Sequence, residues 1–377
     1  MSRIDELIAE HCPDGVELKE LGELLDYEQP GKYLVDSTDY DDSYTTPVLT
    51  AGQTFILGYT NETDGIYPAS PEDPVIIFDD FTTAFKWVDF PFKAKSSAMK
   101  MITPRSKNSE SLRYAYYAMQ TIGYEPQDHA RQWIGTYSKF RIPAPPSKVQ
   151  HEIVKVLDTF TKLEAELEAE LEARRRQYNY YRDQLLSFED GEVEWKTLGE
   201  LAENLDSKRK PITSGLRDTG DIPYYGASGI VDYVKDYIFD GDFLLVSEDG
   251  ANLLARSTPI AFSVSGKSWV NNHAHVLKFE TYAERRYVEY YLNSIDLTPY
   301  ISGAAQPKLN QKNLNGIKVP NPSPEEKGYI VAILDTFDAL TNSISEGLPR
   351  EIALRQKQYE YYRELLLSFP KPEDVAA

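Results

Sequence analysis

The longest regular pattern of apolar positions covers residues 149–188. Apolar side chains return at steps of mostly three or four residues, which places them on one face of an α-helix. They are Val149, Ile153, Val156, Phe160, Leu163, Leu167, Leu171, Tyr178, Tyr181, Leu185 and Phe188. The segment contains no Gly or Pro. A helix of roughly 40 residues rises about 60 Å, so we expect a long spacer rather than a helix inside one domain.

The helical pattern occurs twice, because the chain is internally repeated. Residues 177–188 (QYNYYRDQLLSF) and 358–369 (QYEYYRELLLSF) are identical at nine of twelve positions. Three further pairs of segments match: residues 16–24 with 193–201, 141–146 with 318–323, and 156–160 (VLDTF) with 333–337 (ILDTF). The chain therefore alternates a lobe, a helical segment, a second lobe and a second helical segment.

The two helical segments differ in length. Matching residues are 177 positions apart at the start of each segment but 181 apart at its end, so the second segment has four extra residues. These fall at residues 345–352 (SEGLPREI), where Gly347 followed by Pro349 predicts that one helix ends and another begins. The first segment instead continues through LEAELEAE at residues 163–170, which we interpret as a spacer.

The segments before each helix have the composition and the short apolar runs of irregular α+β domains. They are rich in Tyr, Thr, Ser, Gly and Pro, with short strand-like runs and one helix-like stretch each, near residues 112 and 285. We predict an α+β fold with a pseudo-two-fold internal repeat, in which two similar domains are separated by two long antiparallel helical spacers forming a coiled coil. The predicted parts are lobe 1 (1–147), a central spacer (148–190), lobe 2 (191–322), a C-terminal spacer (323–370) and a tail (371–377).

Composition narrows the class of protein. Hydrophobic residues make up 41% of the chain, which is enough for real cores, but the longest apolar runs are strand-sized and predict no membrane contact. The N-terminal residues carry acids where a signal peptide needs a basic start. The single cysteine, Cys12, excludes an internal disulfide and fits a reducing cytoplasm. The net charge of −20 argues at first sight against a nucleic-acid partner.

Two related lobes joined by paired helices nevertheless suit a ligand with two half-sites. DNA read at points one helical turn apart, about 34 Å, is the obvious case. Equivalent side chains near the ends of the two spacers could also receive two copies of one partner protein. For the tyrosines, packing of one spacer on the other explains the repeat equally well. The candidate partner-binding residues are Tyr178, Tyr181, Arg182, Leu185, Tyr359, Tyr362, Arg363 and Leu366.

These repeated motifs resemble the specificity (S) subunit of a type I restriction–modification system. The resemblance rests on the two Tyr-rich segments, VLDTF and ILDTF, SEGLPREI and LEAELEAE, and it covers essentially the whole chain. It implies two target-recognition domains, each reading one half of a split sequence in double-stranded DNA, and helices that set the spacing. It also implies a role in DNA methylation and phage defence.

The resemblance further implies that this chain is not an enzyme and holds no cofactor. Two modification subunits would dock on the helices and bring S-adenosylmethionine. Restriction subunits, which use ATP and Mg²⁺, would join through the modification subunits. Each of the four long segments has more acidic than basic side chains. Phosphate contacts must therefore come from local basic clusters, and partner subunits could supply much of the remaining positive charge.

The candidate DNA contacts combine basic, amide, hydroxyl and aromatic side chains, which can bind phosphates or base edges. In lobe 1 they are Lys93, Lys95, Ser96, Lys100, Arg131, Gln132, Trp133 and Tyr137. In lobe 2 they are Lys208, Arg209, Ser228, Lys267, Trp269, Gln306, Lys308, Gln311 and Lys312. Residues 131–133 and 306–312 occupy comparable places, shortly before the matching strands that lead to the spacers. An ordinary solvated charge is the alternative for each basic residue.

Catalytic and metal-binding patterns are weak. The sequence has no amino-methyltransferase motif, and Gly266-Lys267-Ser268 lacks the first glycine of a phosphate-binding loop. The Glu-x-Lys pairs at residues 17 and 194 are best interpreted as strand starts. His273 and His275 share a strand face without a neighbouring acidic or cysteine cluster in the sequence, so we expect packing or hydrogen bonding there, not metal.

Two other functions remain open at this stage. The chain could be an acidic coiled-coil scaffold that joins proteins without reading DNA. A self-contained restriction enzyme is the more remote alternative, because the motifs for catalysis are missing.

Overall fold

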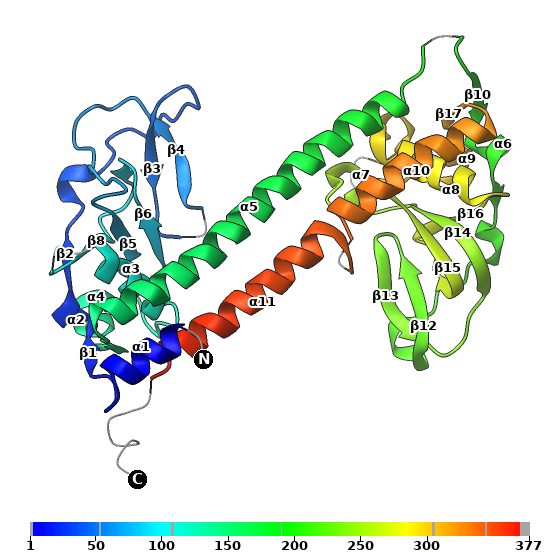
Figure 1. Ribbon diagram of the computed structural model, residues 1–377. Helices are drawn as coiled ribbons and strands as arrows, with labels where there is room; N and C mark the ends of the chain where they lie inside the picture. Colours follow the sequence, from blue (N-terminus) through cyan, green and yellow to red (C-terminus); the bar gives the residue numbers. More distant parts are fainter. Residues whose placement is uncertain are drawn as a thin grey trace. The chain divides into compact units, whose positions relative to one another are not determined.

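The computed structural model describes residues 3–52, 54–106, 109–189, 191–303, 306–343 and 345–369. The predicted tail at 371–377 and the last residue of the C-terminal spacer lie outside them. The chain forms two compact units: unit 1 is Met1–Leu167 with Ile352–Ala377, and unit 2 is Glu168–Glu351. Each unit contains one lobe and part of the long helices (Figure 1). The predicted α+β class is confirmed.

Lobe 1 is built on a four-stranded antiparallel sheet with a smaller sheet beside it. The main sheet has the order β2 (Leu25–Glu28), β8 (Met99–Pro104), β5 (Val75–Asp79), β6 (Phe85–Val88). The smaller sheet is β4 (Ile56–Thr60), β3 (Thr46–Leu49), β7 (Lys93–Ala94), and β1 (Leu18–Glu20) pairs with β9 (Arg141–Pro143). The α-helices that accompany them are α1 (Arg3–His11), α2 (Leu21–Leu24), α3 (Ser109–Met119) and α4 (Gln132–Gly135).

Strand β5 is the centre of lobe 1 because both of its faces are covered. Ile76 and Phe78 pack in one core cluster with Leu112 of α3. Val75 and Ile77 pack in a second cluster with residues of the smaller sheet. This explains why residues 74–78 (PVIIF) are continuously apolar, since a strand buried on both faces shows no alternation.

Lobe 2 repeats this plan in a larger sheet. Its order is β11 (Glu203–Asn204), β16 (Ala274–Lys278), β14 (Phe239–Ser247), β15 (Ala261–Val270), β12 (Thr219–Gly226), β13 (Gly229–Val234). Strand β10 (Glu194–Thr197) pairs with β17 (Lys318–Asn321) as β1 does with β9. The helices are α6 (Leu198–Leu201), α7 (Asn252–Ala255), α8 (Tyr282–Ser294) and α9 (Gln311–Asn315). The central strand β14 corresponds to β5, with Leu244 and Val246 in one cluster and Leu245 in another.

The long helices follow the sequence pattern closely. Helix α5 runs unbroken through Ser147–Leu185, so it ends three residues before the apolar pattern does, at Phe188. The second helical segment is broken as predicted, into α10 (Pro324–Thr341) and α11 (Gly347–Leu367). Gly347 has φ +74°, and a side chain there would collide with the carbonyl oxygens of Ala339 and Leu340. The turn therefore requires glycine.

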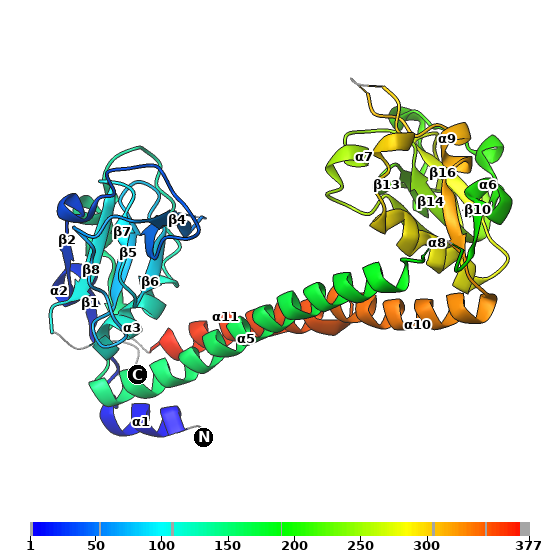
Figure 2. The same cartoon turned by 90° about the horizontal axis from the view of Figure 1, so that it is seen from above.

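The repeat appears in how the helices pack. Within unit 1, Phe160 of α5 stacks on Tyr362 of α11, with ring centroids 5.4 Å apart. Within unit 2, Phe337 of α10 stacks on Tyr181 of α5 at 5.8 Å. Phe160 matches Phe337 and Tyr181 matches Tyr362 in the repeat, so one contact is made twice with its roles exchanged. Antiparallel pairing of two repeated helices predicts this exchange, and Figure 2 shows α11 and α10 each beside its part of α5.

Each lobe is also fixed to its own spacer helix by an equivalent pair of hydrogen bonds. In unit 1, Arg113 Nε donates to Asp158 Oδ1 at 2.7 Å, and the Tyr117 hydroxyl donates to the same oxygen. In unit 2, Arg286 Nε and the Tyr290 hydroxyl donate to Asp335 Oδ1 at 2.9 and 2.7 Å. These hydrogen bonds join α3 to α5 and α8 to α10. Because each involves an ionised carboxylate, it is stronger than a neutral hydrogen bond.

Candidate functional site

Two lysines of the lobe 1 candidates are buried in ion pairs. Lys93 pairs with Glu62 and donates to the Asp64 carbonyl at 2.9 Å. Lys100 Nζ lies 2.8 Å from Asp80 Oδ2, and both side chains are inaccessible to solvent. These two lysines hold lobe 1 together, and we do not carry them into the proposed DNA interface. Lys95 and Ser96 are half-buried, with Lys95 Nζ donating to the Tyr40 hydroxyl at 3.0 Å.

The Arg131-Gln132-Trp133 segment turns mostly inward. The Gln132 side chain is buried and hydrogen-bonded to the Tyr124 hydroxyl, Asp128 and the Ala130 carbonyl. Trp133 is buried and stacks on Tyr137, with ring centroids 6.1 Å apart. Only Arg131 of these four candidates is exposed. Sequence clustering cannot separate the two sides of a short loop, because alternation over three or four residues gives no reliable phase.

Lobe 2 exposes more of its candidates. The exposed ones are Lys208, Ser228, Lys267, Gln306, Lys308, Gln311 and Lys312. Ser228 lies at the turn between β12 and β13, and Lys267 Nζ lies over the Tyr237 ring at 4.6 Å. Gln311 and Lys312 begin helix α9, where the Asn310 side chain caps Asn313 N. Trp269 is half-buried and donates from Nε1 to the Lys210 carbonyl.

Arg209 belongs instead to a largely buried ionic network. Its Nη1 lies 2.6 Å from Glu248 Oε2 and 2.8 Å from the Ala274 carbonyl oxygen, and its Nη2 lies 3.4 Å from Asp206. Glu248 also pairs with Lys308 Nζ at 3.0 Å. The network therefore connects η3 (Asp206–Lys208), the residue after β14, strand β16 and the segment before α9.

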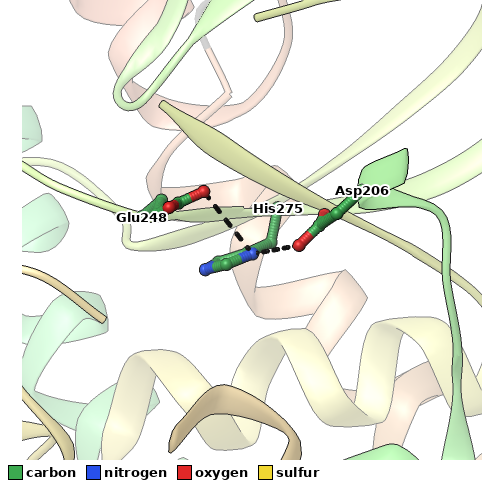
Figure 3. Close-up of side chains that lie close together, drawn as sticks. All are labelled: Asp206, Glu248 and His275. Carbon is green, nitrogen blue, oxygen red and sulfur yellow. Dashed lines mark hydrogen bonds and ion pairs between the residues drawn. The ribbon is translucent and has the colours of Figure 1, made fainter. Parts of the chain in front are cut away.

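His275 lies at the centre of this network, between Asp206 and Glu248 (Figure 3). Its Nδ1 is 2.6 Å from Asp206 Oδ2 and 3.8 Å from Glu248 Oε2. Its Nε2 is 2.7 Å from the Leu309 carbonyl oxygen. Both ring nitrogens face acceptors, so both bonds form together only when the ring carries two protons.

The expectation that no acidic cluster accompanies the histidines was wrong. Asp206 and Glu248 surround His275, and Asp249 lies 2.9 Å from Nδ1 of the exposed His273, which precedes β16. These acids are distant in sequence, so spacing could not reveal them. The predicted hydrogen bonding of His275 is confirmed. Both carboxylates already pair with Arg209, and Glu248 also pairs with Lys308. This arrangement favours an ion-pair network over a metal centre.

Burial and pairing act in opposite directions on the two carboxylates. Burial opposes ionisation of Asp206, but the hydrogen bond from His275 and the positive charges nearby hold its pKa below the ordinary value. Burial likewise opposes ionisation of Glu248, while Arg209 and Lys308 lower its pKa. The net shift is downward for both, so the network favours the ionised carboxylates.

The weak catalytic patterns are explained by strands. Gly266 and Lys267 lie inside the ten-residue strand β15, so they form no phosphate-binding loop. Lys19 pairs with Glu17 at 3.4 Å beside β1, and Lys196 pairs with Glu194 at 3.5 Å in β10. The predicted strand starts are confirmed.

Known proteins identify the family to which this architecture belongs. The model of the type I restriction modification DNA specificity domain matches twice, at residues 13–173 and 191–354. The specificity subunit of the type I restriction enzyme EcoR124I/EcoR124II from Escherichia coli is 48% identical over 410 aligned residues, covering 100% of this chain and 99% of the relative. The chain belongs to the family of type I specificity subunits.

Other relatives agree with this assignment. A putative type I specificity subunit from Haemophilus influenzae is 41% identical over 191 residues, covering 50% of this chain and 49% of that protein. The crystal structure of a type I S subunit from M. genitalium superposes with a TM-score of 0.64 at 16% identity, covering 93% and 96% of the two chains. That structure supports the fold.

Membership of the family settles the class of function. A type I specificity subunit recognises the DNA target within a restriction–modification complex, and catalysis with its cofactors resides in the modification and restriction subunits. The scaffold and self-contained-enzyme alternatives are therefore rejected. In the part of the chain that the structure describes, no helix is long and apolar enough to cross a membrane.

The predicted partner-binding tyrosines of this specificity subunit are engaged within the chain. Tyr178 and Leu185 pack against the lobe 2 core, and Tyr359 and Leu366 pack against the lobe 1 core. Tyr181 and Tyr362 form the stacks described above. Arg182 pairs with Asp183 and lies against the Tyr178 ring, while Arg363 Nη1 and the Tyr359 hydroxyl donate to Gln120 Oε1. Their role in docking stays a prediction.

Sequence reasoning missed the most exposed tyrosine of each Tyr-rich segment. Tyr180 is 59% exposed and Tyr361 is 62% exposed, at equivalent positions of QYNYY and QYEYY. The helical period could have found them, because each lies two residues, or about 200°, from the tyrosine that packs into a lobe.

Proposed function

We propose that each lobe of this specificity subunit reads one half of a bipartite sequence in double-stranded DNA. The observation that supports this most directly is the equivalence of the lobes. Arg131 and the segment at 306–312 lie at corresponding places, next to the residue that follows the central strand of each lobe. Two similar reading surfaces require two half-sites, and nothing in the repeat makes the half-sites identical in sequence.

The candidate side chains that the structure leaves exposed form the proposed interface. They are Arg131 in lobe 1, and Lys208, Ser228, Lys267, Gln306, Lys308, Gln311 and Lys312 in lobe 2. Arginine, lysine and glutamine can form hydrogen bonds with base edges, and lysine and serine can bind phosphates. The chain has a net charge of −20, so we expect modification subunits to supply part of the positive surface that DNA requires.

Binding of DNA by the whole complex tests this assignment. We expect Arg131→Ala to lower discrimination within one half-site and Lys312→Ala to lower it within the other, measured by titration with DNA carrying single base changes. Affinity should fall as salt rises, because cations are released from the phosphates. A complex that binds all sequences equally at every salt concentration would contradict the proposal.

We further propose that the paired helices set the gap between the half-sites and dock two modification subunits, through which restriction subunits join, in the cytoplasm where the DNA lies. On this proposal lobes 1 and 2 (1–147 and 191–322) are the target-recognition domains, and residues 148–190 and 323–370 are the spacers. The two exposed tyrosines, Tyr180 and Tyr361, are equivalent and point away from the lobe cores. Tyrosine is enriched at the centres of protein interfaces, so these two side chains support two copies of one docking site.

Subunit counting tests the docking proposal. Tyr180→Ala and Tyr361→Ala should each weaken binding of one modification subunit, and the double variant should weaken both, as measured by native mass spectrometry. Tyr329→Ala is the matched control, because Tyr329 is an exposed tyrosine of α10 whose repeat partner is Glu152. Equal loss in the control and the test variants would show that these two tyrosines are not the docking sites.

A further inference from the structure

An acidic residue follows the central strand in both lobes. Asp80 comes directly after β5, and Glu248 comes directly after β14. Asp80 N donates to the Ala98 carbonyl oxygen at 3.1 Å, and Glu248 N donates to the His273 carbonyl oxygen at 2.8 Å. Ala98 and His273 immediately precede β8 and β16, the neighbouring strands. The two acids therefore occupy the same position in the shared frame.

The backbone carbonyl of each acid accepts a hydrogen bond from the segment that carries the proposed DNA-contacting residues. Gln132 N donates to the Asp80 carbonyl oxygen at 2.8 Å, and Leu309 N donates to the Glu248 carbonyl oxygen at 2.8 Å. Residues 132 and 309 are 177 positions apart, which is the offset of the lobe repeat. The same attachment is thus made in both lobes, although the attached sequences differ.

The carboxylates strengthen this attachment by different means. In lobe 1, Asp80 Oδ1 accepts a hydrogen bond from Trp133 N at 2.8 Å, at the start of α4, and Oδ2 pairs with Lys100. In lobe 2, Glu248 Oε1 pairs with the half-exposed Lys308 and Oε2 pairs with Arg209. Both acids are almost fully buried, so they orient the segment and are not themselves accessible to DNA.

We propose that Asp80 and Glu248 are positioning residues for DNA readout, which fix the orientation of Arg131 in lobe 1 and of Lys308 and Lys312 in lobe 2. This inference rests on the proposed function, because it requires those exposed residues to contact DNA. Arg131 directly precedes the residues held by Asp80. Helix α9, with Gln311 and Lys312 exposed in its first turn, begins two residues after the one held by Glu248.

Paired variants separate positioning from folding in lobe 1. Asp80→Ala alone would leave Lys100 buried without a counter-charge, so both lobe 1 variants also carry Lys100→Met. The Asp80→Asn/Lys100→Met chain keeps an oxygen that can accept from Trp133 N, whereas Asp80→Ala/Lys100→Met does not. In lobe 2 the corresponding pair is Glu248→Gln and Glu248→Ala. Glu72→Gln and Glu280→Gln are the controls, since they neutralise exposed acids that lie before β5 and after β16, away from Asp80 and Glu248.

The readout is methylome sequencing of cells that carry the full chain with its modification subunits. One wrong base pair normally weakens specific binding by roughly 5- to 150-fold. We expect each alanine variant to lose about tenfold of this discrimination, in one half-site for Asp80 and in the other for Glu248. The Asn and Gln variants should retain most of it, and the gap should not change. Thermal unfolding of each purified complex checks that the lobes remain folded.

Three results would overturn the inference. In the first, Arg131→Ala and Lys312→Ala alter the half-sites, but the alanine variants of Asp80 and Glu248 fold and do not. These two acids, the anchors, then have no positioning role, while the proposed function stands. If the Asn and Gln variants lose as much discrimination as the alanine variants, the acceptor oxygen is not what matters. If none of the variants, including Arg131→Ala and Lys312→Ala, alters a half-site, the proposed location of DNA reading itself is wrong.

Discussion

The two lobes hold equivalent segments with different chemistry. In lobe 1 the acid after the central strand forms one fully buried pair, Asp80 with Lys100. In lobe 2 the equivalent Glu248 belongs to a network with Arg209, Lys308 and His275 that reaches the surface. The backbone attachment is the same in both. The difference teaches that the repeat preserves the backbone frame, whereas the side chains around it are free to diverge. The proposed reading of two different half-sites requires such divergence.

Exchanging one of the two lobes should have the largest effect. Replacing residues 191–322 with the corresponding lobe of another specificity subunit should replace one half-site completely and leave the other unchanged, because lobe 1 is untouched. Methylome sequencing of cells carrying the hybrid complex measures this. If both half-sites change, the lobes do not read DNA independently.

The buried pair of lobe 1 should be more sensitive to loss of its cation than the network of lobe 2. Lys100→Met leaves the inaccessible Asp80 carboxylate uncompensated and should lower the free energy of unfolding by about 3–5 kcal/mol. Lys308→Met removes a half-exposed lysine and should cost roughly 1 kcal/mol or less. Thermal denaturation of the two variants compares them, and equal losses would remove the distinction between the two anchors.

The helices offer a second comparison, because α5 is unbroken while its repeat is divided into α10 and α11. Inserting another LEAE unit after Glu170 adds about 6 Å and roughly 40° of rotation. At ~3.4 Å per base pair, the gap between half-sites should grow by one or two base pairs. Methylated sites in cells report the gap directly. An unchanged gap would show that the helices do not act as a ruler.

The smallest predicted effect is the response of the lobe 2 network to acid. The pKa values of Asp206 and Glu248 are lowered in the folded chain. Their contribution to stability is therefore complete above the unfolded values near 4. It should be lost as pH falls below about 4, through the lower folded values. Unfolding of the Glu248→Gln variant between pH 3 and 6 should depend less steeply on pH than that of the unchanged chain, and identical slopes would contradict this.

The sequence predicts the framework well because the framework depends on periodicity and repetition. The unbroken α5, the break at Gly347 and the buried strands β5 and β14 all follow from local patterns. The surroundings of individual side chains could not be predicted as well. Lys100 and Trp133 are buried although their residue types suggested surface contacts, and His275 meets acids that are distant in the sequence. Which face of a short loop points inward depends on tertiary packing, which spacing does not encode.

One measurement tests the central claim most directly: mapping methylated bases in the DNA of cells that express this chain with its modification subunits. Two lobes that read separate half-sites predict a single motif made of two short defined sequences with an unspecified gap of fixed length. A continuous motif, or methylation without sequence preference, would contradict the account.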